Sequence, residues 1–326
     1  MDLVTPAHMW AANDRTIGRE HDQSHSRRMP WLQRSIMFAS VIVPIAGLAV
    51  AVSVLWTRRR TEGGIGWPEA IVTLAMYALT GFGVTIGYHR LLTHRSFETR
   101  RAVRLLRAVL GSSAGQGMVI RWCATHRRHH QRADREGDPH SPHQHGGGIG
   151  GLIHGFWHAH MGWVFQRDLS GLARSVPDLL ADRALLMIDQ LYFVWVAGGL
   201  LVPAAALGLL LHSWHGCLDG LIWGGLVRIC LMQHVTWSVN SVCHIWGRRP
   251  FESHDHSTNN LPVAILSLGE GWHNNHHAFP TSARHGLRWW QIDPSYVVIV
   301  LMKRVGLAWN IRVQTQNAMM AKTRPS

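Results

Sequence analysis

The sequence SIMFASVIVPIAGLAVAVSVLW fills residues 35–56 and contains no charged side chain. A helix needs roughly 20 apolar residues to cross about 30 Å of hydrocarbon, so this stretch predicts a membrane-spanning helix. Three further apolar stretches of sufficient length lie at residues 67–88, 185–212 and 216–244. The last of them contains Asp219, Arg228 and His234, and ionisable groups inside a bilayer are costly and usually functional. The sequence therefore predicts an all-α, multi-pass membrane protein with four transmembrane helices.

The composition supports a membrane protein and excludes several other classes. Of the 326 residues, 47% are hydrophobic and only 16% are charged, whereas soluble domains have about 25% charged residues. The apolar content also excludes a disordered chain. The four cysteines form no C-x-x-C pair and predict no disulfide framework. The net charge of +13, interleaved with apolar runs, favours a membrane surface over nucleic acid as the partner.

The basic residues predict the orientation in the membrane. Five lie in residues 1–34, fourteen in residues 89–183 and nine after residue 244, whereas the opposite side holds only Arg58, Arg59 and Arg60. Because Lys and Arg accumulate on the cytoplasmic side, we expect both termini and the long middle region there. The predicted organisation is a polar N-terminal segment (1–34), a membrane domain (35–293) and a C-terminal tail (294–326).

The histidines form three groups with regular spacing. They are H-x-x-x-x-H at His89 and His94, H-x-x-H-H at His126, His129 and His130, and H-x-x-H-H at His273, His276 and His277. Helical residues three and four apart share a face, so each H-x-x-H-H is predicted to aim three imidazoles at a common centre. Five residues at about 100° each separate His89 from His94 around an α-helix. These two converge only if the helix ends or bends between them; otherwise they serve different metal ions.

Eight imidazoles indicate more than one metal ion. Nitrogen ligands suit Fe, Zn, Cu or Ni and disfavour Mg and Ca, and a single zinc takes only three or four ligands. The spacing predicts two ions and leaves iron and zinc both open. Histidines outside the groups, among them His285, are interpreted as ordinary surface or core residues.

The same segments, with their flanks, match a known family. The matching sequences are GYHRLLTHRSF (87–97), WCATHRRHHQRADREGDPHSP (122–142), TWSVNSVCH (236–244) and GEGWHNNHHAFP (269–280). From about residue 67 to residue 293 the chain resembles the integral-membrane fatty acid desaturases, most closely the acyl-CoA Δ9 (stearoyl-CoA-like) branch. The resemblance implies a cytoplasmic helical cap that carries a histidine-rich site for two iron ions (Fe²⁺), with O₂ as co-substrate.

The resemblance also implies individual residue roles. The iron ligands would be His89, His94, His126, His129, His130, His244, His273, His276 and His277, with Asn240 reaching one metal through water. His140 is not a ligand in the family, and we expect a structural role for it.

Four residues are expected to contact the acyl chain. Gln116 and Trp122 match family positions beside the chain, and Trp237 is expected nearby. Tyr77 lies 12 residues before His89, or about 18 Å along a helix, and could close the end of the acyl tunnel.

The acyl carrier is less clearly indicated. Ala124 stands where the acyl-CoA branch has an arginine that holds CoA. Arg121, Arg127 or Arg128 could replace that phosphate contact, since Arg suits phosphate. Acyl-carrier protein and phospholipid remain open as carriers.

The predicted reaction is insertion of a cis double bond into a saturated acyl chain, of Δ9 type and carried on CoA. It uses O₂ and two external electrons. The chain has no G-x-G-x-x-G motif that follows a strand, and so no visible nicotinamide or flavin site. A ferredoxin with its reductase, or a cytochrome b5-type protein, is therefore expected as donor. A hydroxylase on the same scaffold is one alternative. A membrane metal transporter is another, although its ligands should lie near mid-span, whereas these lie at span ends. Arg-rich usage and the lack of an ER-retention tail favour a bacterial plasma membrane.

Overall fold

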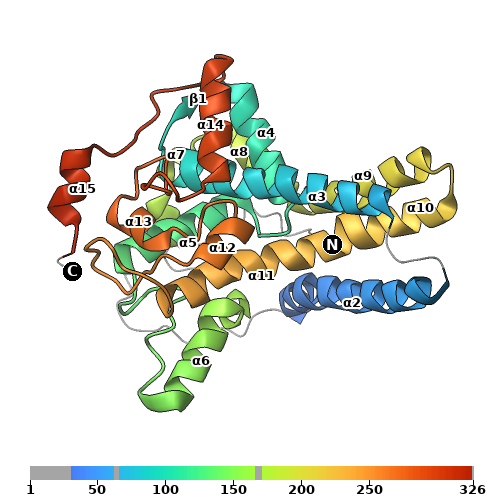
Figure 1. The fold of residues 1–326 in the computed structure, drawn as a ribbon, viewed down its shortest axis with the longest axis horizontal. Helices are drawn as coiled ribbons and strands as arrows, with labels where there is room; N and C mark the ends of the chain where they lie inside the picture. The colour runs from blue at the N-terminus through green and yellow to red at the C-terminus, as the bar shows by residue number, and fades with distance from the viewer. Residues whose placement is uncertain (1–30, 62–65, 166–170, 325–326) are drawn as a thin grey trace.

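The computed structural model describes residues 31–61, 66–165 and 171–324, and these are largely helical (Figure 1). The predicted polar N-terminal segment lies outside them up to residue 30. The elements up to the second histidine group are α2 (Trp31–Thr61), α3 (Trp67–Phe82), the π-helix η1 (Gly83–Thr93), β1 (Glu98–Thr99), α4 (Arg101–Ser112) and α5 (Val119–Arg132).

The second half of the chain is helical as well. It comprises α6 (Gly148–His160), η2 (Gly162–Phe165), η3 (Leu172–Ser175), α7 (Pro177–Leu180), α8 (Arg183–Gln190), α9 (Tyr192–Leu210), α10 (Trp214–Asp219), the π-helix η4 (Gly220–Val227), α11 (Arg228–Ser241), η5 (Val242–His244), α12 (Leu261–Leu266), α13 (His273–Ala278), α14 (Pro294–Arg304), β2 (Ala308–Trp309) and α15 (Gln316–Lys322).

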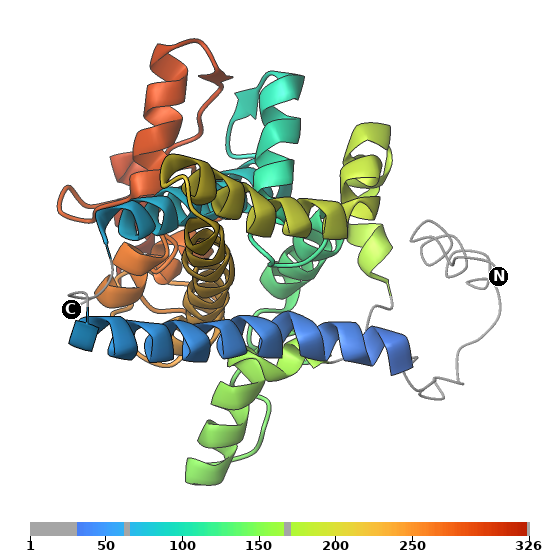
Figure 2. The ribbon, with the colours of Figure 1, turned by 90° about the vertical axis from the view of Figure 1, so that its right-hand side faces the viewer.

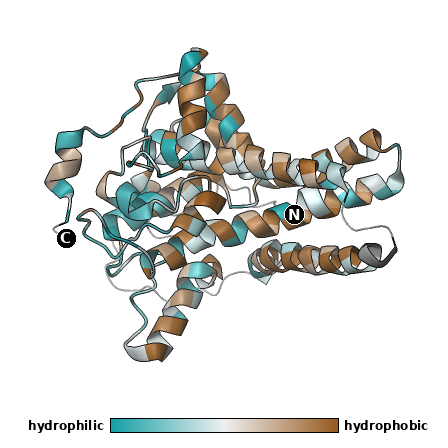
Figure 3. Ribbon diagram, viewed as in Figure 1, coloured by the Kyte–Doolittle hydropathy of each residue, from teal (hydrophilic) through white to brown (hydrophobic). Residues whose placement is uncertain are grey.

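Four helices in the described residues are long and apolar enough to cross a membrane, as predicted. They are Arg34–Thr57, Trp67–Thr93, Tyr192–Leu210 and Trp214–His244. Apolar residues dominate these helices, whereas hydrophilic residues gather around α5 and α13 (Figure 3). The third helix is shorter than the apolar stretch 185–212, because Leu191 leaves the helical conformation (φ −85°, ψ 16°) and separates α8 from α9. The chain is therefore a multi-pass membrane protein.

Glycines bring η1 and α4 into backbone contact. A Cβ atom on Gly83 would lie 2.3 Å from the Gly111 nitrogen, and one on Gly87 would lie 2.9 Å from Cβ of Arg107. Small residues four apart on one helix allow such close approach, as they do between membrane helices generally. Because η1 carries His89, this contact fixes the height and rotation of the first histidine group.

Arg228 is buried within the fourth membrane helix and has its hydrogen bonds satisfied. Its guanidinium donates to the carbonyls of Gly224 (3.2 Å), Ser113 (2.8 Å) and Gly199 (2.7 Å). A buried charge is costly unless it is hydrogen-bonded. Arg228 therefore ties α11 to α9 and to the loop after α4.

The segment predicted as a C-terminal tail packs against the body up to α15. Ile299 and Met302 of α14 join a buried apolar cluster with Ile86 and Phe97. Strand β2 pairs antiparallel with β1. The sequence offered little warning of this, because α14 is short and the strands have two residues each.

Two membrane helices end in the same part of the fold. The α3–η1 helix and the α10–α11 helix both finish where α5 and α13 lie (Figure 1). Figure 2 shows the molecule from the end at which α9 and α10 meet. In this view α4 and α14 project to one side of the long helices and α6 to the other. The histidine groups therefore meet at one end of the bundle.

Candidate metal centre

The predicted histidines form two separate clusters. The first cluster contains His89, His94, His126, His130 and His276, and the second contains His129, His244, His273 and His277. Within each cluster one nitrogen from every ring lies within 4.8 Å of the others. All nine predicted histidine ligands are therefore brought together, at buried or half-buried positions.

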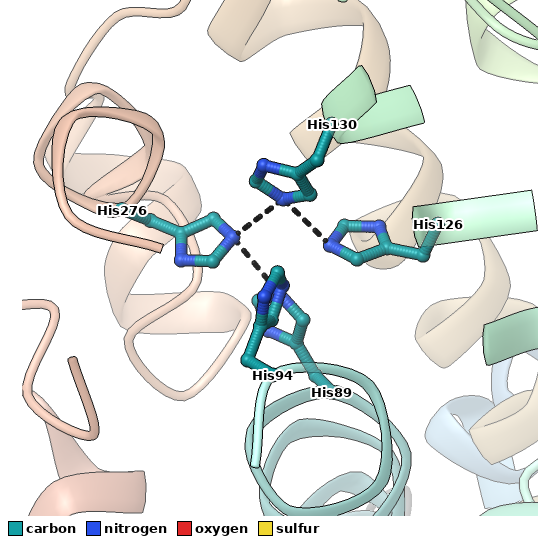
Figure 4. A group of neighbouring side chains, drawn as sticks. All are labelled: His89, His94, His126, His130 and His276. Carbon is teal, nitrogen blue, oxygen red and sulfur yellow. Dashed lines mark hydrogen bonds between the residues drawn. The ribbon is translucent and has the colours of Figure 1, made fainter. Parts of the chain in front are cut away.

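The first cluster is drawn in Figure 4, with rings from η1, α5 and α13 pointing toward a common centre. The Nε2 atom of His276 lies 2.9 Å from that of His130 and 3.1 Å from that of His89. The Nε2 atoms of His126 and His130 are 3.1 Å apart. Three segments that are distant in the sequence thus supply one set of nitrogen donors.

The π-helix η1 explains how His89 and His94 converge. The His94 backbone N–H donates to the His89 carbonyl at 3.1 Å, a contact five residues apart. A π-helix forms i→i+5 bonds, so residues five apart come close to the same face. Helix η1 also ends there, with His94 as its C-cap. This is the departure from α-helical geometry that convergence requires.

The prediction that each H-x-x-H-H aims three rings at a common centre is wrong. His126 and His130 enter the first cluster, whereas His129 enters the second. Adjacent helical residues point about 100° apart, so His129 and His130 face different centres. The third group divides in the same way, with His276 in the first cluster and His277 in the second. Each motif therefore bridges two sites.

The second cluster is surrounded by carboxylates that the sequence analysis did not assign. In three of its four rings, Nδ1 donates to an aspartate. The pairs are His129 with Asp138 (2.9 Å), His244 with Asp134 (2.9 Å) and His277 with Asp255 (2.5 Å). A carboxylate in this position fixes the tautomer of the imidazole and raises its basicity as a metal ligand.

Three imidazoles of the first cluster have lowered pKa values and are neutral near pH 7. Burial lowers the pKa of His126, His130 and His276 well below the usual value, and neighbouring imidazoles lower it further. In the second cluster burial lowers the pKa of His277 to about 4, although the Asp255 carboxylate opposes this. Neutral imidazole is the form that binds a metal.

The aspartates beside the second cluster are ionised. Burial alone would raise the pKa of Asp138, but the imidazole of His129 lowers it below its usual value. The same balance lowers the pKa of Asp255 beside His277. These carboxylates accept hydrogen bonds from the Nδ1–H groups. The free lone pair of each of these rings therefore lies at Nε2.

The nitrogen geometry fits a bound cation. The Nε2 atoms of His129 and His277 lie 3.3 Å apart while both Nδ1 atoms donate to carboxylates. Two lone pairs in this arrangement repel each other unless a cation lies between them. At metal–nitrogen distances of about 2.1 Å, neighbouring ligands are about 3.0 Å apart in an octahedral site and about 3.4 Å apart in a tetrahedral one. The clusters could therefore each hold one metal ion.

Glu270 and His285 extend the first cluster. His89 Nδ1 lies 2.5 Å from Glu270 Oε2, and Arg90 donates to Glu270 (3.2 Å) and to Asp293 (2.9 Å). His285 is buried with its ring centroid 4.5 Å from that of His276. Its interpretation as an ordinary histidine missed this place beside the metal ligands. The sequence contained no signal for it, because His285 belongs to no repeated motif.

His140 lies beside the second cluster and is not one of the nine predicted histidine ligands. Its ring is 4.3 Å from that of His129, and its backbone N–H donates to Asp138 at 3.1 Å. The expected structural role remains a prediction, since His140 could also join a metal-binding group with His129 and Asp138.

A narrow cavity opens onto both clusters. Its polar wall includes His89 and His126 of the first cluster, His273 of the second, and Asn240. Its apolar wall is formed by Val84, Trp122, Met232, Val239, Leu266 and Leu268. Trp122 stacks on His126 with ring centroids 5.2 Å apart. Of the four residues expected at the substrate, Trp122 lines this cavity, and so does Asn240, which is expected to reach one metal through water.

The other three expected substrate residues lie outside the cavity wall. Tyr77 packs beside Val84 and Met232, and its hydroxyl donates to the Leu266 carbonyl at 2.8 Å. Trp237 is buried against the rings of His160 and His234. Gln116 has a buried Nε2 atom that finds no hydrogen-bond partner among the described residues. Their contact with an acyl chain stays a prediction.

Comparison with known proteins identifies this arrangement. The model of the fatty acid desaturase family matches residues 65–301, a region that contains both histidine clusters and the cavity. The chain belongs to the fatty acid desaturase family. The resemblance seen in the histidine motifs is thereby confirmed, and the protein is an oxidoreductase.

Relatives of this desaturase differ in the carrier that bears the acyl chain. One is the hex-5-enoyl-[acyl-carrier protein] acetylenase of Moorena producens, 39% identical over 86% of this chain and 87% of that protein. The sn-1 stearoyl-lipid 9-desaturase of Anabaena variabilis is 39% identical over 76% and 85%. The acyl-CoA C20 Delta5-desaturase of Anemone leveillei is 40% identical over 77% and 76%.

Proposed function

We propose that this desaturase inserts a cis double bond into a saturated acyl chain at a pair of iron ions held by the two clusters. The observation that carries the proposal is the cavity, which combines an apolar wall with rings from both clusters. An acyl chain in it would place a methylene beside both metal positions. Because the overall change removes two hydrogens and reduces O₂ to two waters, it needs two external electrons and two protons.

The metal ions are needed because no side chain can carry out this step. Side-chain pKa values lie between about 4 and 13, far below the value for a mid-chain methylene. A reduced iron pair would supply the oxidising power by activating O₂. The protein supplies position: the cavity has an apolar wall, and the Trp122 ring stacked on His126 would limit how the chain can bend. Holding two carbons at fixed places is a proximity effect.

Asn240 is proposed to hold a water at one metal position. It lines the cavity and lies one helical turn before His244, a ring of the second cluster.

The double bond is proposed to form at the Δ9 position of the acyl chain. That position depends on how far the acyl chain enters the cavity.

CoA is the carrier we propose, with acyl-carrier protein and lipid as the alternatives that the relatives' names supply. Ala124 stands where the acyl-CoA branch has its CoA-binding arginine. Arg127 does not take over that contact, because the Arg127 guanidinium already pairs with Asp178 at 2.6 Å. Arg121 and Arg128 remain as proposed phosphate contacts.

Electrons are proposed to come from a ferredoxin with its reductase or from a cytochrome b5-type protein. An acidic donor would be steered toward basic residues on the cluster side. Arg132 and Arg135 follow His129 in the sequence, Arg248 follows His244, and all three arginines are exposed. We place the protein in a bacterial plasma membrane with this side in the cytoplasm.

The test is the acyl profile of membranes from a host that expresses the chain. We expect new monounsaturated acyl chains, with the double-bond position read from mass spectra of disulfide adducts. His273→Ala, which removes one ring of the second cluster, should abolish them. Hydroxylated chains would instead identify a hydroxylase. Altered metal uptake without any new lipid would identify a transporter.

A further inference from the structure

The two clusters differ in the charge that surrounds them. Three rings of the second cluster donate to aspartates, namely Asp134, Asp138 and Asp255. In the first cluster only His89 has such a partner, Glu270. Within the described residues, the other four rings of the first cluster contact no carboxylate. The second cluster therefore carries three carboxylates against one.

The single carboxylate of the first cluster is also partly neutralised. Arg90 is fully buried and forms ion pairs with both Glu270 (3.2 Å) and Asp293 (2.9 Å). The aspartates of the second cluster accept instead from neutral donors: Asp134 accepts from the Ser141 hydroxyl, and Asp255 from the Ser257 backbone N–H. Arg249 donates to the backbone carbonyl of Asp255, and within the described residues it forms no ion pair with that carboxylate.

We propose that the second cluster holds its metal ion more tightly than the first, so that metal leaves the first cluster first. This inference rests on the proposed two-metal centre. The first cluster has one imidazole more, but that ligand is neutral. Three carboxylates each orient a ring and place a full negative charge near a dication. Loss of one such partner typically weakens metal binding by about 10–100-fold.

The experiment is chelator competition on the purified full-length chain in detergent, loaded with two Co²⁺ ions. Bound metal is counted by atomic emission after gel filtration at increasing chelator concentration. We expect two steps with a plateau at one ion per chain. Asp138→Asn should lower the chelator concentration at which the second ion is released by about 10–100-fold. The chelator concentration that releases the first ion should not change. Glu270→Gln should move only the step at low chelator.

Asp182→Asn is the matched control, because Asp182 pairs with Arg104 and contacts neither cluster. Asp134→Asn and Asp255→Asn repeat the test if Asp138→Asn fails to give a monodisperse protein. The inference is overturned if Glu270→Gln moves the tight step, or if both ions leave together in the unmodified chain.

Activity distinguishes the two proposals. A chain that releases its ions in two steps but forms no unsaturated lipid would contradict only the proposed function. An active desaturase that releases both ions in one step would contradict only this inference.

Discussion

Tyr77 lies on the second membrane helix, beside the apolar end of the cavity. Its ring packs with Val84 and Met232, and its hydroxyl donates to the Leu266 carbonyl. Truncating a packed side chain leaves a cavity because neighbours relax only partly, so Tyr77→Ala should lengthen the preferred acyl chain by about two carbons. The measurement is the chain-length distribution of unsaturated products in expressing membranes.

Tyr77→Phe is the control for that change, because it keeps the ring and removes only the hydrogen bond to Leu266. Its product profile should match the unmodified chain. An unaltered profile in Tyr77→Ala would reject Tyr77 as the end of the tunnel.

At the residue scale the rings that meet in the two clusters could be predicted, whereas their hydrogen-bond partners could not. The repeated H-x-x-H-H spacing identifies six of the nine rings from sequence, and His244 came only from the family resemblance. Asp255 and Glu270 reach the rings through loops whose folding no local pattern specifies. His285 is adjacent to His276 for the same reason.

At the scale of elements, the contact between η1 and α4 should control metal binding. A Cβ atom on Gly83 would overlap the Gly111 backbone, which cannot move as a flexible side chain can. Overpacking of this kind costs about 1–3 kcal/mol, and the displacement would shift His89. We expect Gly83→Ala to lower both the melting temperature and the metal content per chain.

Gly198→Ala serves as its control, since a Cβ atom on Gly198 in α9 would meet nothing within 4 Å. A helical Gly→Ala change in open space should be neutral or stabilise by up to about 1 kcal/mol. Equal metal loss in both variants would show that the η1–α4 contact is not responsible.

The contact between α8 and α5 should be sensitive to pH. Asp189 is buried and accepts from the Ile120 N–H at 2.8 Å, and burial raises its pKa from 3.8 to about 6. The folded state therefore binds the proton more tightly than the unfolded state, so stability falls as the pH rises from about 4 to 6. Two pKa units correspond to about 3 kcal/mol.

Asp189→Asn keeps an acceptor for Ile120 without the charge. Its melting temperature should exceed that of the unmodified chain at pH 7, and the difference should shrink at pH 4. A variant that is destabilised at pH 7 but not at pH 4 would mean that the carboxylate is needed in its ionised form.

At the scale of the whole molecule, length and hydropathy were enough to predict four membrane helices and their order. They could not predict that α14 and β2 pack on the body, because that depends on a surface formed by Ile86 and Phe97 of distant segments. They also missed the helix break at Leu191, since the apolar run continues through it. Local patterns reveal which segments are apolar, whereas tertiary contacts decide where a helix ends.

The orientation of the molecule gives the last prediction. The second and fourth membrane helices both end at the histidine clusters, and 28 basic residues flank the spans on that side by the sequence count. The positive-inside rule then places the clusters in the cytoplasm. Arg248, exposed shortly after His244, marks the cluster side, and Trp214, exposed at the start of α10, marks the far side.

Single cysteines at these two positions can be compared in a Cys217→Ala background, because the other three cysteines are buried. In spheroplasts of a bacterial host, a membrane-impermeant maleimide should label Trp214→Cys. It should label Arg248→Cys only after lysis. The reverse pattern would place the clusters outside the cytoplasm, where cytoplasmic ferredoxin or acyl-CoA could not reach them, and both donor and carrier proposals would have to be abandoned.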